Sequence, residues 1–333
     1  MSAATPRPSA VPTLADIQAP VREGLERVTE ELRRIIAADF SLITEVNEHL
    51  LRMRGKMFRP TLTLLSSQVA DRPSPRAPTL AALIELMHVA TLVHDDAVDH
   101  STLRRGLRTI YALFSHQVSV IMGDYLYSKA LGTLVKNGDM EPLRILTDVS
   151  TQMTIGEMRQ LQQFDRLAFS EDDYHALNRA KTASLLSGAC EIGAISGAER
   201  YRAELKRYGE LLGMAFQVAD DLLDYTADAA VTGKPTGLDL RERKVTLPLI
   251  AALRDMSAGA RARVDALFVQ ETPDDASIAE VVAIVAESGG IEYARRRGEA
   301  FADEADAVLQ ALPETAARAA LSDAITYVME RRW

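Results

Sequence analysis

The sequence has little of several features that define common protein classes. Its 333 residues include one cysteine, Cys190, and aromatic residues make up only 5% of the chain. Intrachain disulfides are therefore excluded. No apolar run reaches 18 residues, so we expect no transmembrane segment. Basic residues are outnumbered, with 38 Lys and Arg against 47 Asp and Glu, which argues against a nucleic-acid partner, because a surface that follows phosphates needs positive charge.

The first residues of the chain predict its domain organisation. They read MSAATPRPSAVP, which is polar, rich in proline and without the apolar core of a signal peptide. We expect residues 1–15 to form a flexible tail. No linker or change in composition after residue 20 indicates a second domain, so we expect residues 16–333 to form one domain of a cytoplasmic protein.

Proline is unevenly placed, and most of the chain is free to form helices. Seven of the 13 prolines lie in residues 6–20 and 73–78, and only five follow residue 78. Apolar residues recur at helical spacing, as at Leu80, Leu83 and Met87, while alternating strand-like runs are scarce. We therefore predict an all-α protein of about ten or more helices. Loops are expected near residues 54–60, 71–78, 101–108, 137–142 and 227–245.

One acidic pattern occurs twice. The segments 95–99 and 220–224 both read DDxxD and begin 125 residues apart. Residues four apart share one face of a helix, so Asp95 lies over Asp99, and Asp220 lies over Asp224. Like charges at this spacing repel each other, and a divalent cation would relieve the repulsion. Oxygen-only ligands favour Mg²⁺ or Mn²⁺, and Mg²⁺ takes further ligands from water and substrate phosphates.

Basic residues accompany both acidic patterns. They are Lys56 and Arg59 before the first pattern, Arg104 and Arg105 after it, Lys181 between the two, and Lys234 and Lys244 after the second. Cations beside acidic clusters in an acidic protein indicate bound polyphosphate, because guanidinium and ammonium groups bind phosphate oxygens. For each cluster or cation taken alone, a solvated charged surface is the alternative interpretation.

Together these segments resemble the trans-isoprenyl diphosphate synthases, the polyprenyl synthetase family. The resemblance runs from about residue 40 and rests on GKMFRP, ELMHVATLVHDDAVDHSTLRRG, MGDYLYSKAL, the Lys181-Thr182 pair, FQVADDLLD and GKPTGLDLRERKVTLPLI. It implies a single-domain helical bundle around a deep central cavity, the isoprenoid synthase fold, assembled as a homodimer. Two departures are visible. The first basic motif usually reads GGKRxRP, whereas Arg54 and Met57 stand here, and His100, to which we assign no role, follows Asp99.

The resemblance also implies the chemistry, a condensation of an allylic diphosphate with isopentenyl diphosphate. It makes Asp95, Asp99 and Asp220 the foremost ligands of Mg²⁺ (or Mn²⁺), with Asp96, Asp221 and Asp224 as direct or indirect ligands. It assigns the allylic diphosphate to Arg104, Lys181 and Lys234, with Lys244 nearby, and isopentenyl diphosphate to Lys56, Arg59, His88 and Arg105. Thr182 and Gln217 would present oxygen atoms to the allylic carbocation.

Product length is implied by the residues before Asp95. In the family, a bulky aromatic residue five positions before this aspartate gives short products, and here that residue is Ala90, followed by Thr91. With Met87 nearer the cavity floor, the resemblance predicts a long product of the quinone-tail type. Helix geometry alone does not place Ala90 on the cavity wall, because it lies about 140° around the helix from Asp95. A helix–helix contact is the alternative role for Ala90.

Three other functions stay open at this point. They are a short-chain (C15–C20) synthase, a class I terpene cyclase, which usually replaces the second acidic pattern, and a non-catalytic partner subunit, which typically loses Asp or Lys positions. A metal phosphohydrolase built on His94-Asp95 is disfavoured, because His94 lies off the face that carries Asp95 and Asp99. Cys190 lies among small apolar residues and is expected in the core.

Overall fold

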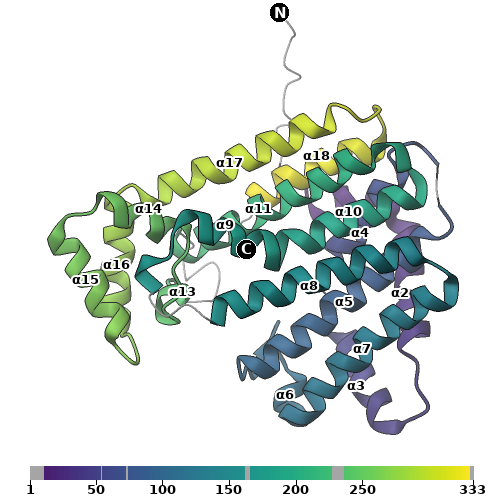
Figure 1. Cartoon of the computed structure of the whole chain (residues 1–333), viewed down its shortest axis with the longest axis horizontal. Helices are drawn as coiled ribbons and strands as arrows, with labels where there is room; N and C mark the ends of the chain where they lie inside the picture. Colours follow the sequence, from purple (N-terminus) through teal and green to yellow (C-terminus); the bar gives the residue numbers. More distant parts are fainter. Residues whose placement is uncertain (1–10, 54, 73, 162–165, 227–235, 331–333) are drawn as a thin grey trace, which may run out of the picture.

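The computed structural model describes residues 11–53, 55–72, 74–161, 166–226 and 236–330 and is built almost entirely of α-helices (Figure 1). The first part contains α1 (Leu14–Gln18), α2 (Arg22–Ile36), α3 (Ser41–Arg52), α4 (Phe58–Gln68), α5 (Ala77–Val98), α6 (Ile110–Leu113), α7 (His116–Asn137) and α8 (Met140–Leu161). The second part contains α9 (Glu171–Asn178), α10 (Ser184–Gly197), α11 (Arg202–Thr226), α13 (Leu238–Arg241), α14 (Leu247–Asp255), α15 (Ala258–Val269), α16 (Asp275–Glu287), α17 (Gly290–Leu309) and α18 (Ala316–Met329). The predicted all-α fold is confirmed.

Short turns of other helix types join several of these helices. Three are 3₁₀ turns, at Ala19–Val21, Arg166–Ala168 and Glu199–Tyr201, and one is a π-helical turn at Arg179–Ala183. Helix α1 begins at Leu14, so the last two residues of the expected tail, 14 and 15, are helical. The expected loop at 227–245 contains α13, and its residues 227–235 lie outside the described part of the chain.

The predicted loop at 101–108 is largely a β-hairpin. Strand β1 (Leu103–Arg104) pairs antiparallel with β2 (Leu107–Arg108), with Leu103 opposite Arg108. The two tip residues, Arg105 and Gly106, have φ angles of 53° and 76°. Positive φ at both positions gives the backbone twist that two-residue hairpins prefer. The turn places Arg105 beside the segment that precedes α4, where a Cβ on Gly55 would lie 2.6 Å from its guanidinium.

Helix α5 lies in the interior of the bundle. It spans 22 residues and every residue from Leu80 to Met87 is buried. By length and hydropathy it could cross a membrane, but 67% of its apolar window is buried inside the protein. It packs against α2, α4, α7 and α10. A helix that is apolar on all sides is typical of a protein core, so burial accounts for its composition.

Helices α10 and α11 complete the core, and glycines let them approach their neighbours. Residues 185–194 of α10 are all buried. A Cβ on Gly193 would lie 2.3 Å from the backbone oxygen of Thr63, and one on Gly213 would lie 2.5 Å from the Cα of Ala183. Only a residue without a Cβ permits these approaches. The second brings α11 against the π-helical turn that carries Lys181 and Thr182.

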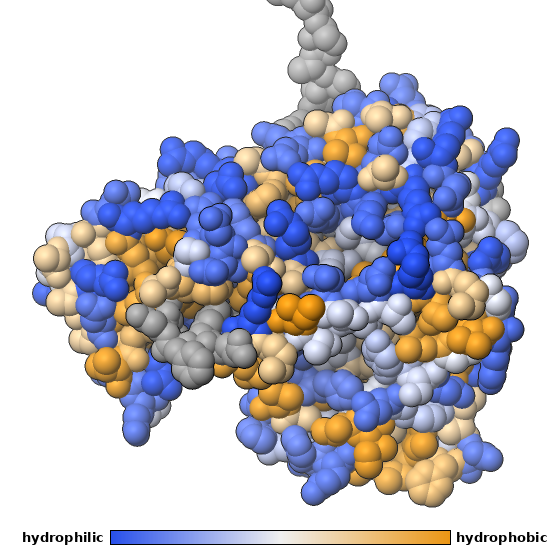
Figure 2. Space-filling view, in the orientation of Figure 1, coloured by the Kyte–Doolittle hydropathy of each residue, from blue (hydrophilic) through white to orange (hydrophobic). Residues whose placement is uncertain are grey.

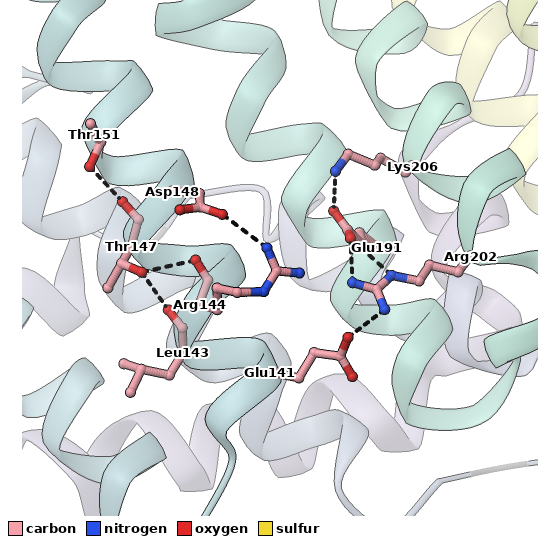
Figure 3. Close-up of polar contacts among 9 residues, drawn as sticks. All are labelled: Glu141, Leu143, Arg144, Thr147, Asp148, Thr151, Glu191, Arg202 and Lys206. Carbon is pink, nitrogen blue, oxygen red and sulfur yellow. Dashed lines mark hydrogen bonds and ion pairs between the residues drawn. The ribbon is translucent and has the colours of Figure 1, made fainter.

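A buried carboxylate ties α10 to the beginning of α11 (Figure 3). Glu191 accepts hydrogen bonds from Nε and Nη2 of Arg202 at 3.0 and 2.8 Å and lies 2.9 Å from Nζ of Lys206. Arg202 also pairs with Glu141 near the start of α8. Because Glu191 is buried, loss of both cations would leave an uncompensated charge in the interior, which costs several kcal/mol. The cluster therefore holds α8, α10 and α11 together on this face.

Candidate active site

The first aspartate cluster lies at the C-terminal end of α5. Asp95 is half-buried, Asp96 is buried, and Asp99 is exposed at the residue where the helix ends. Burial, reinforced by the negative charge of Glu157, raises the pKa of Asp95 to about 6. Asp96 accepts a hydrogen bond from Nε of Arg104 at 2.9 Å. The three aspartates therefore differ: Asp99 is exposed, Asp95 is half-buried near Glu157, and Asp96 is buried and bound to Arg104.

The second cluster lies near the end of α11, and its aspartates also have different surroundings. Asp220 is exposed. Asp221 is buried and accepts hydrogen bonds from the Tyr174 hydroxyl and from Nε2 of Gln217, the latter at 2.9 Å. Burial raises the pKa of Asp221 well above its usual range, and the negative charge of Asp239 adds to the effect. Asp221 is thus held by neighbouring side chains.

Asp224, the third residue of this cluster, anchors α13. Its Oδ1 and Oδ2 atoms accept hydrogen bonds from the backbone amides of Leu238 and Asp239 at 2.9 and 3.0 Å. These amides lie at the N-terminal end of α13, where a carboxylate is favoured. Burial nevertheless raises the pKa of Asp224. The contact connects α11 to the segment that carries Lys244.

Lys244 interacts electrostatically with residues of both clusters. Burial disfavours its charged form, but the hydrogen bond and charge of Glu242 and the charges of Asp239 and Asp99 outweigh this and raise its pKa. The charge of Lys244 in turn acts on Asp224 of the second cluster. One ammonium group is thus within electrostatic reach of α5 and α11. That both acidic patterns face each other across a common site stays a prediction.

Asp239 is an acidic residue of this space that the motif analysis did not single out. Burial, followed by the charge of Asp224, raises its pKa to about 7, although Lys244 acts in the opposite direction. The sequence signal was weak, because Asp239 stands in the mixed-charge run LDLRERK, which reads as a solvated surface. Its role depends on the contact between α13 and Asp224, which sequence periodicity does not reveal.

The carboxylates are suited to a divalent cation that brings ligands of its own. Among the described residues, no three His, Cys, Asp or Glu side chains are gathered closely enough to form a complete metal site. Burial, with neighbouring carboxylates, raises the pKa of Asp95 to about 6 and that of Asp239 to about 7, so their ionised forms are poorly stabilised without a cation. Mg²⁺ commonly uses one or two carboxylates together with water and substrate phosphates. The donor set therefore fits a metal bound together with a phosphate substrate.

Lys181 and Thr182 lie on the π-helical turn, and each contacts a neighbouring helix. Nζ of Lys181 is 2.6 Å from Oε1 of Glu157 and 2.9 Å from Oε1 of Gln160, both on α8. The hydroxyl of Thr182 donates to Oε1 of Gln217 at 3.0 Å. π-Helical turns are frequent at functional sites, because the extra residue changes the direction of the side chains. The structure thus joins Thr182 to Gln217 beside Asp221 of the second cluster. Lys181, with Glu157, acts instead on Asp95 of the first cluster.

Glu157 and Gln160 were missed in the sequence. Their signal was an acidic and an amide residue three positions apart on α8, a spacing that places both on one helix face. Such pairs are common on solvated helices, so the pattern carried little information by itself. The contact with Lys181 requires the backbone of α8 to lie close to the π-helical turn. A Cβ on Gly156 would lie only 3.1 Å from the backbone nitrogen of Lys181.

Four residues assigned by resemblance to isopentenyl diphosphate lie near the start of α4. Burial, together with the positive charges of Arg59 and Arg105, lowers the pKa of His88 well below its usual value. Nη1 of Arg105 donates to the Met53 carbonyl at 3.0 Å. Lys56 is exposed, with Nζ 3.2 Å from the Tyr327 hydroxyl. Arg59, Arg105 and a neutral His88 thus form one electropositive group, with Lys56 at its edge.

Met57, which differs from the usual family motif, lies at a turn of the backbone. Met57 has a φ of 53° and immediately precedes α4, where its carbonyl accepts the amide of Thr61 at 3.0 Å. Gln18 donates to the carbonyl of Lys56 at 2.9 Å and to the Thr61 hydroxyl at 3.1 Å. Helix α1 therefore supports the turn that presents Lys56.

Two residues predicted for the allylic diphosphate require comment. Arg104 is bonded to Asp96, so its guanidinium neutralises the first cluster from within the protein. Lys234 lies outside the described residues. The sequence motif placed Arg104 near the right cluster, but it could not reveal the Asp96 partner, which depends on how the hairpin folds back on α5.

The predicted chain-length residues lie on α5. Ala90 and Met87 are buried, and Thr91 is half-buried, with its hydroxyl donating to the carbonyl of His88 at 2.8 Å. An apolar cavity borders α5, but the residues that line it are the neighbouring Leu86 and Val89. The structure therefore places Ala90 inside the protein without setting it on the wall of this cavity.

The remaining residues that the motifs single out have plain surroundings. His94 lies beside Asp124 at 3.3 Å and Val120 on α7, off the face of Asp95, as expected. His100 contacts the ring of Tyr111, with ring centroids 5.4 Å apart. Cys190 is buried in the core, which raises its pKa to about 12. In the contacts of the described residues, none of these three side chains touches an aspartate of either cluster.

Comparison with known proteins gives a consistent result. Residues 40–285 match the model of the Polyprenyl synthetase family. The chain is 36% identical to an all-trans-nonaprenyl-diphosphate synthase (geranyl-diphosphate specific) of Rhodobacter capsulatus, over 95% of this chain and 97% of that protein. It is 33% identical to a short chain isoprenyl diphosphate synthase of Methanothermobacter thermautotrophicus, over 93% and 94%.

A solved structure extends the similarity to three dimensions. The polyprenyl synthase of Caulobacter crescentus CB15, crystallised with calcium and isoprenyl diphosphate, superposes with a TM-score of 0.89 at 30% identity. The similarity covers 98% of this chain and all of that one. Helical architecture, paired aspartate clusters and whole-length sequence similarity lead to one conclusion: this chain belongs to the polyprenyl synthetase family.

Proposed function

We propose that this protein is a divalent-metal-dependent prenyltransferase that joins an allylic diphosphate to isopentenyl diphosphate and releases all-trans polyprenyl diphosphates. One observation carries the proposal. Lys244 interacts electrostatically with Asp99 on α5 and Asp224 on α11, and the raised pKa values of Asp95 and Asp239 indicate that their ionised forms are poorly stabilised without a further cation. A metal bound with diphosphate would supply the missing positive charge and place the diphosphate among the lysines.

The proposed metal is Mg²⁺, with Mn²⁺ as a substitute. Asp95 and Asp99 would bind it from α5 and Asp220 from α11, while Asp239 adds negative charge nearby. Asp96, Asp221 and Asp224 would act indirectly, because their carboxylates already bind Arg104, Tyr174 and the backbone of α13. When bound, the metal stabilises the negative charge that develops on a departing diphosphate.

The protein side chains would then guide the reaction. Lys181 and Lys244 hold the allylic diphosphate while its C–O bond breaks and the electron pair leaves with the diphosphate. The hydroxyl oxygen of Thr182 and the amide oxygen of Gln217 face the allylic cation. The double bond of isopentenyl diphosphate forms the new C–C bond, and loss of a proton to the released diphosphate restores an alkene. No protein nucleophile is required.

The second substrate would bind at the start of α4. Arg59 and Arg105 offer guanidinium groups, and Lys56 adds an ammonium group at the edge. His88 would serve as a neutral hydrogen-bond donor, because its lowered pKa disfavours the protonated ring. This arrangement separates the cationic site for isopentenyl diphosphate from the acidic site for the metal, which prevents both diphosphates from competing for one position.

A long product is the preferred specificity. Helix α5 contains no Phe, Tyr or Trp, and the R. capsulatus relative is a nonaprenyl synthase. A short product is the alternative, because the M. thermautotrophicus relative is a short-chain enzyme of nearly equal similarity. A terpene cyclase and a non-catalytic partner subunit are disfavoured by the complete second cluster and by the retained lysines.

A homodimer is the proposed assembly. Apolar side chains are exposed along α7 and α8, including Ile121 at 64%, Val135 at 58%, Met158 at 53% and Leu161 at 68%. Hydrophobic residues also gather over α7 in the space-filling view (Figure 2). Exposed apolar surface of this kind is typical of a subunit interface. Light scattering of the purified protein tests the assembly, and cell fractionation tests the proposed cytoplasmic location.

One assay separates the candidate functions. Purified protein is incubated with Mg²⁺, farnesyl or geranylgeranyl diphosphate and labelled isopentenyl diphosphate, and the dephosphorylated products are sized. Products longer than C20 support the proposal, and products that stop at C15 or C20 identify a short-chain enzyme. A cyclic hydrocarbon identifies a cyclase. Inactivity that only a second polypeptide reverses identifies a partner subunit.

A further inference from the structure

An apolar cavity lies among α2, α3, α5, α6 and α7 and meets the first aspartate cluster at Asp96. Its walls are apolar and include Ile36, Leu50, Val89 and Leu126, each from a different helix. Among the described residues, the charged side chains that line it are those of Glu85, Asp96, Arg104 and Arg105. The cavity measures about 60 Å³. A water-sized group takes roughly 10–15 Å³ on this measure, so there is room for roughly four to six such groups.

The cavity opens beside the cationic group proposed to bind isopentenyl diphosphate. Gly55 and Met57, which flank Lys56, contribute to its lining together with Arg105. The guanidinium of Arg105 covers Gly55, where a Cβ would lie 2.6 Å from Nη1. The charges of Arg59 and Arg105 also reach Glu85, and burial raises the pKa of this glutamate, which favours its uncharged form. Asp96 and Arg104 neutralise each other.

The cavity lies on the side of α5 away from the predicted chain-length residues. Val89 and Thr91 are two residues apart, which places them about 160° apart around the helix. Leu86, Val89 and Val93 line the cavity, whereas Met87, Ala90 and Thr91 do not. A chain that extends along the Thr91 side therefore does not enter it. By contrast, an apolar tail attached to a diphosphate among Lys56, Arg59 and Arg105 can enter the cavity.

We propose that this cavity is an accessory pocket for the tail of an alkyl or prenyl diphosphate whose head occupies the cationic group of Lys56, Arg59 and Arg105. The ligand class follows from an anion-binding mouth and an apolar interior with room for about four to six carbons. Binding in this mode blocks isopentenyl diphosphate and directs the tail to the side of α5 opposite Thr91, so it is inhibitory. The head-group site rests on the proposed function, whereas the tail pocket rests on the cavity itself.

Calorimetry with n-pentyl diphosphate tests the pocket. Its saturated chain neither ionises nor donates a double bond, and measurements in EDTA remove the metal-dependent allylic site. Methyl diphosphate, with the same head and no tail, is the matched probe. We expect n-pentyl diphosphate to bind the wild-type protein at least tenfold more tightly than methyl diphosphate, and isopentenyl diphosphate to displace it. Equal binding of the two probes would overturn the proposal.

Cavity-filling variants locate the tail. Val89→Phe and Leu50→Phe, on different helices, should each reduce the pentyl preference to below threefold and raise the inhibition constant of n-pentyl diphosphate at least tenfold. Val269→Phe, at a position 80% exposed at the end of α15, is the control and should match wild type. Thermal melting confirms that each variant is folded. If one cavity variant does not fold, the other alone is compared with wild type.

Two outcomes with the variants would contradict the proposal. A preserved pentyl preference in both filled variants means that the tail lies elsewhere. A shortened product in Val89→Phe means that the cavity is the wall of the elongation path. Failure of the proposed function looks different, because the wild-type protein would then show no turnover and isopentenyl diphosphate would not displace the probe, while the effect of the cavity variants on the pentyl preference would still be measurable.

Discussion

The hydroxyl of Tyr174 on α9 donates a hydrogen bond to Oδ2 of Asp221 on α11, and both residues are buried. Gln217 donates to the other oxygen of the same carboxylate and accepts from Thr182. A continuous set of contacts thus runs from α9 through the second aspartate cluster to the π-helical turn. Asp221 is a connecting residue in this set, and Tyr174 positions the carboxylate beside Asp220.

Replacement of Tyr174 by Phe tests this relationship. The change keeps the ring but removes one of the two side-chain donors to a buried carboxylate, which costs roughly 1–3 kcal/mol. We expect a lower Tm and an apparent Mg²⁺ affinity reduced about threefold to tenfold, because Asp220 is adjacent. Metal titrations of activity measure the second effect. Tyr201→Phe is the control, and an unchanged metal titration in Tyr174→Phe would remove Tyr174 from the site.

The raised pKa values predict how metal-free stability depends on pH. Asp95 and Asp239 titrate near 6 and 7 in the folded protein and near 3.8 in the unfolded chain. The folded state therefore binds protons more strongly, so the stability that these groups contribute is present below pH 3.8 and is lost as the pH rises to about 7.

Replacing Asp95 or Asp239 by asparagine should remove this loss of stability at high pH. In EDTA at pH 7.5, we expect Asp95→Asn and Asp239→Asn to melt roughly 2–4 °C above wild type, with a smaller difference near pH 4.5. Mg²⁺ with diphosphate should stabilise wild type more than the variants. Asp303→Asn, on the exposed face of α17, is the control. Variants that melt below wild type at pH 7.5 would contradict the assigned charges.

Ala90 tests product length. A phenylalanine at this position should shorten the product if the growing chain passes it, as the resemblance implies. Because Ala90 is only 1% exposed, the larger ring also strains the core, so Ala90→Leu and Thr91→Phe are measured beside it. Product sizes are compared at equal turnover. An unchanged product ladder in all three folded variants would remove this part of α5 from the elongation path.

Patterns within single helices carried most of the prediction. The stacking of Asp95 over Asp99 and the burial of Leu80, Leu83 and Met87 follow from helical spacing alone. Thr182 and Gln217, both singled out by the resemblance, contact each other, while their role toward the carbocation stays a prediction. These features could be predicted, because each depends on the local chain or on motifs of strong specificity.

Contacts between elements could not be predicted in the same way. Tyr174, Glu157 and Asp239 acquire their surroundings only when α8, α9 and α13 pack beside the clusters, and each stands in an ordinary polar segment of the sequence. Arg104 turned toward Asp96 because a hairpin with two positive φ angles folds back on α5. The division into a tail of residues 1–15 and a domain of residues 16–333 stays a prediction.

The central claim is that the two clusters bind one metal–diphosphate complex, and Mn²⁺ binding measured by electron paramagnetic resonance tests it most directly. The titration uses an allylic analogue in which sulfur replaces the bridging oxygen, so that the diphosphate does not leave. We predict tight binding only with the analogue present, weakened at least tenfold by Asp95→Ala and equally by Asp220→Ala, with Asp303→Ala unchanged. Wild-type Mn²⁺ affinity in either cluster variant would contradict the claim.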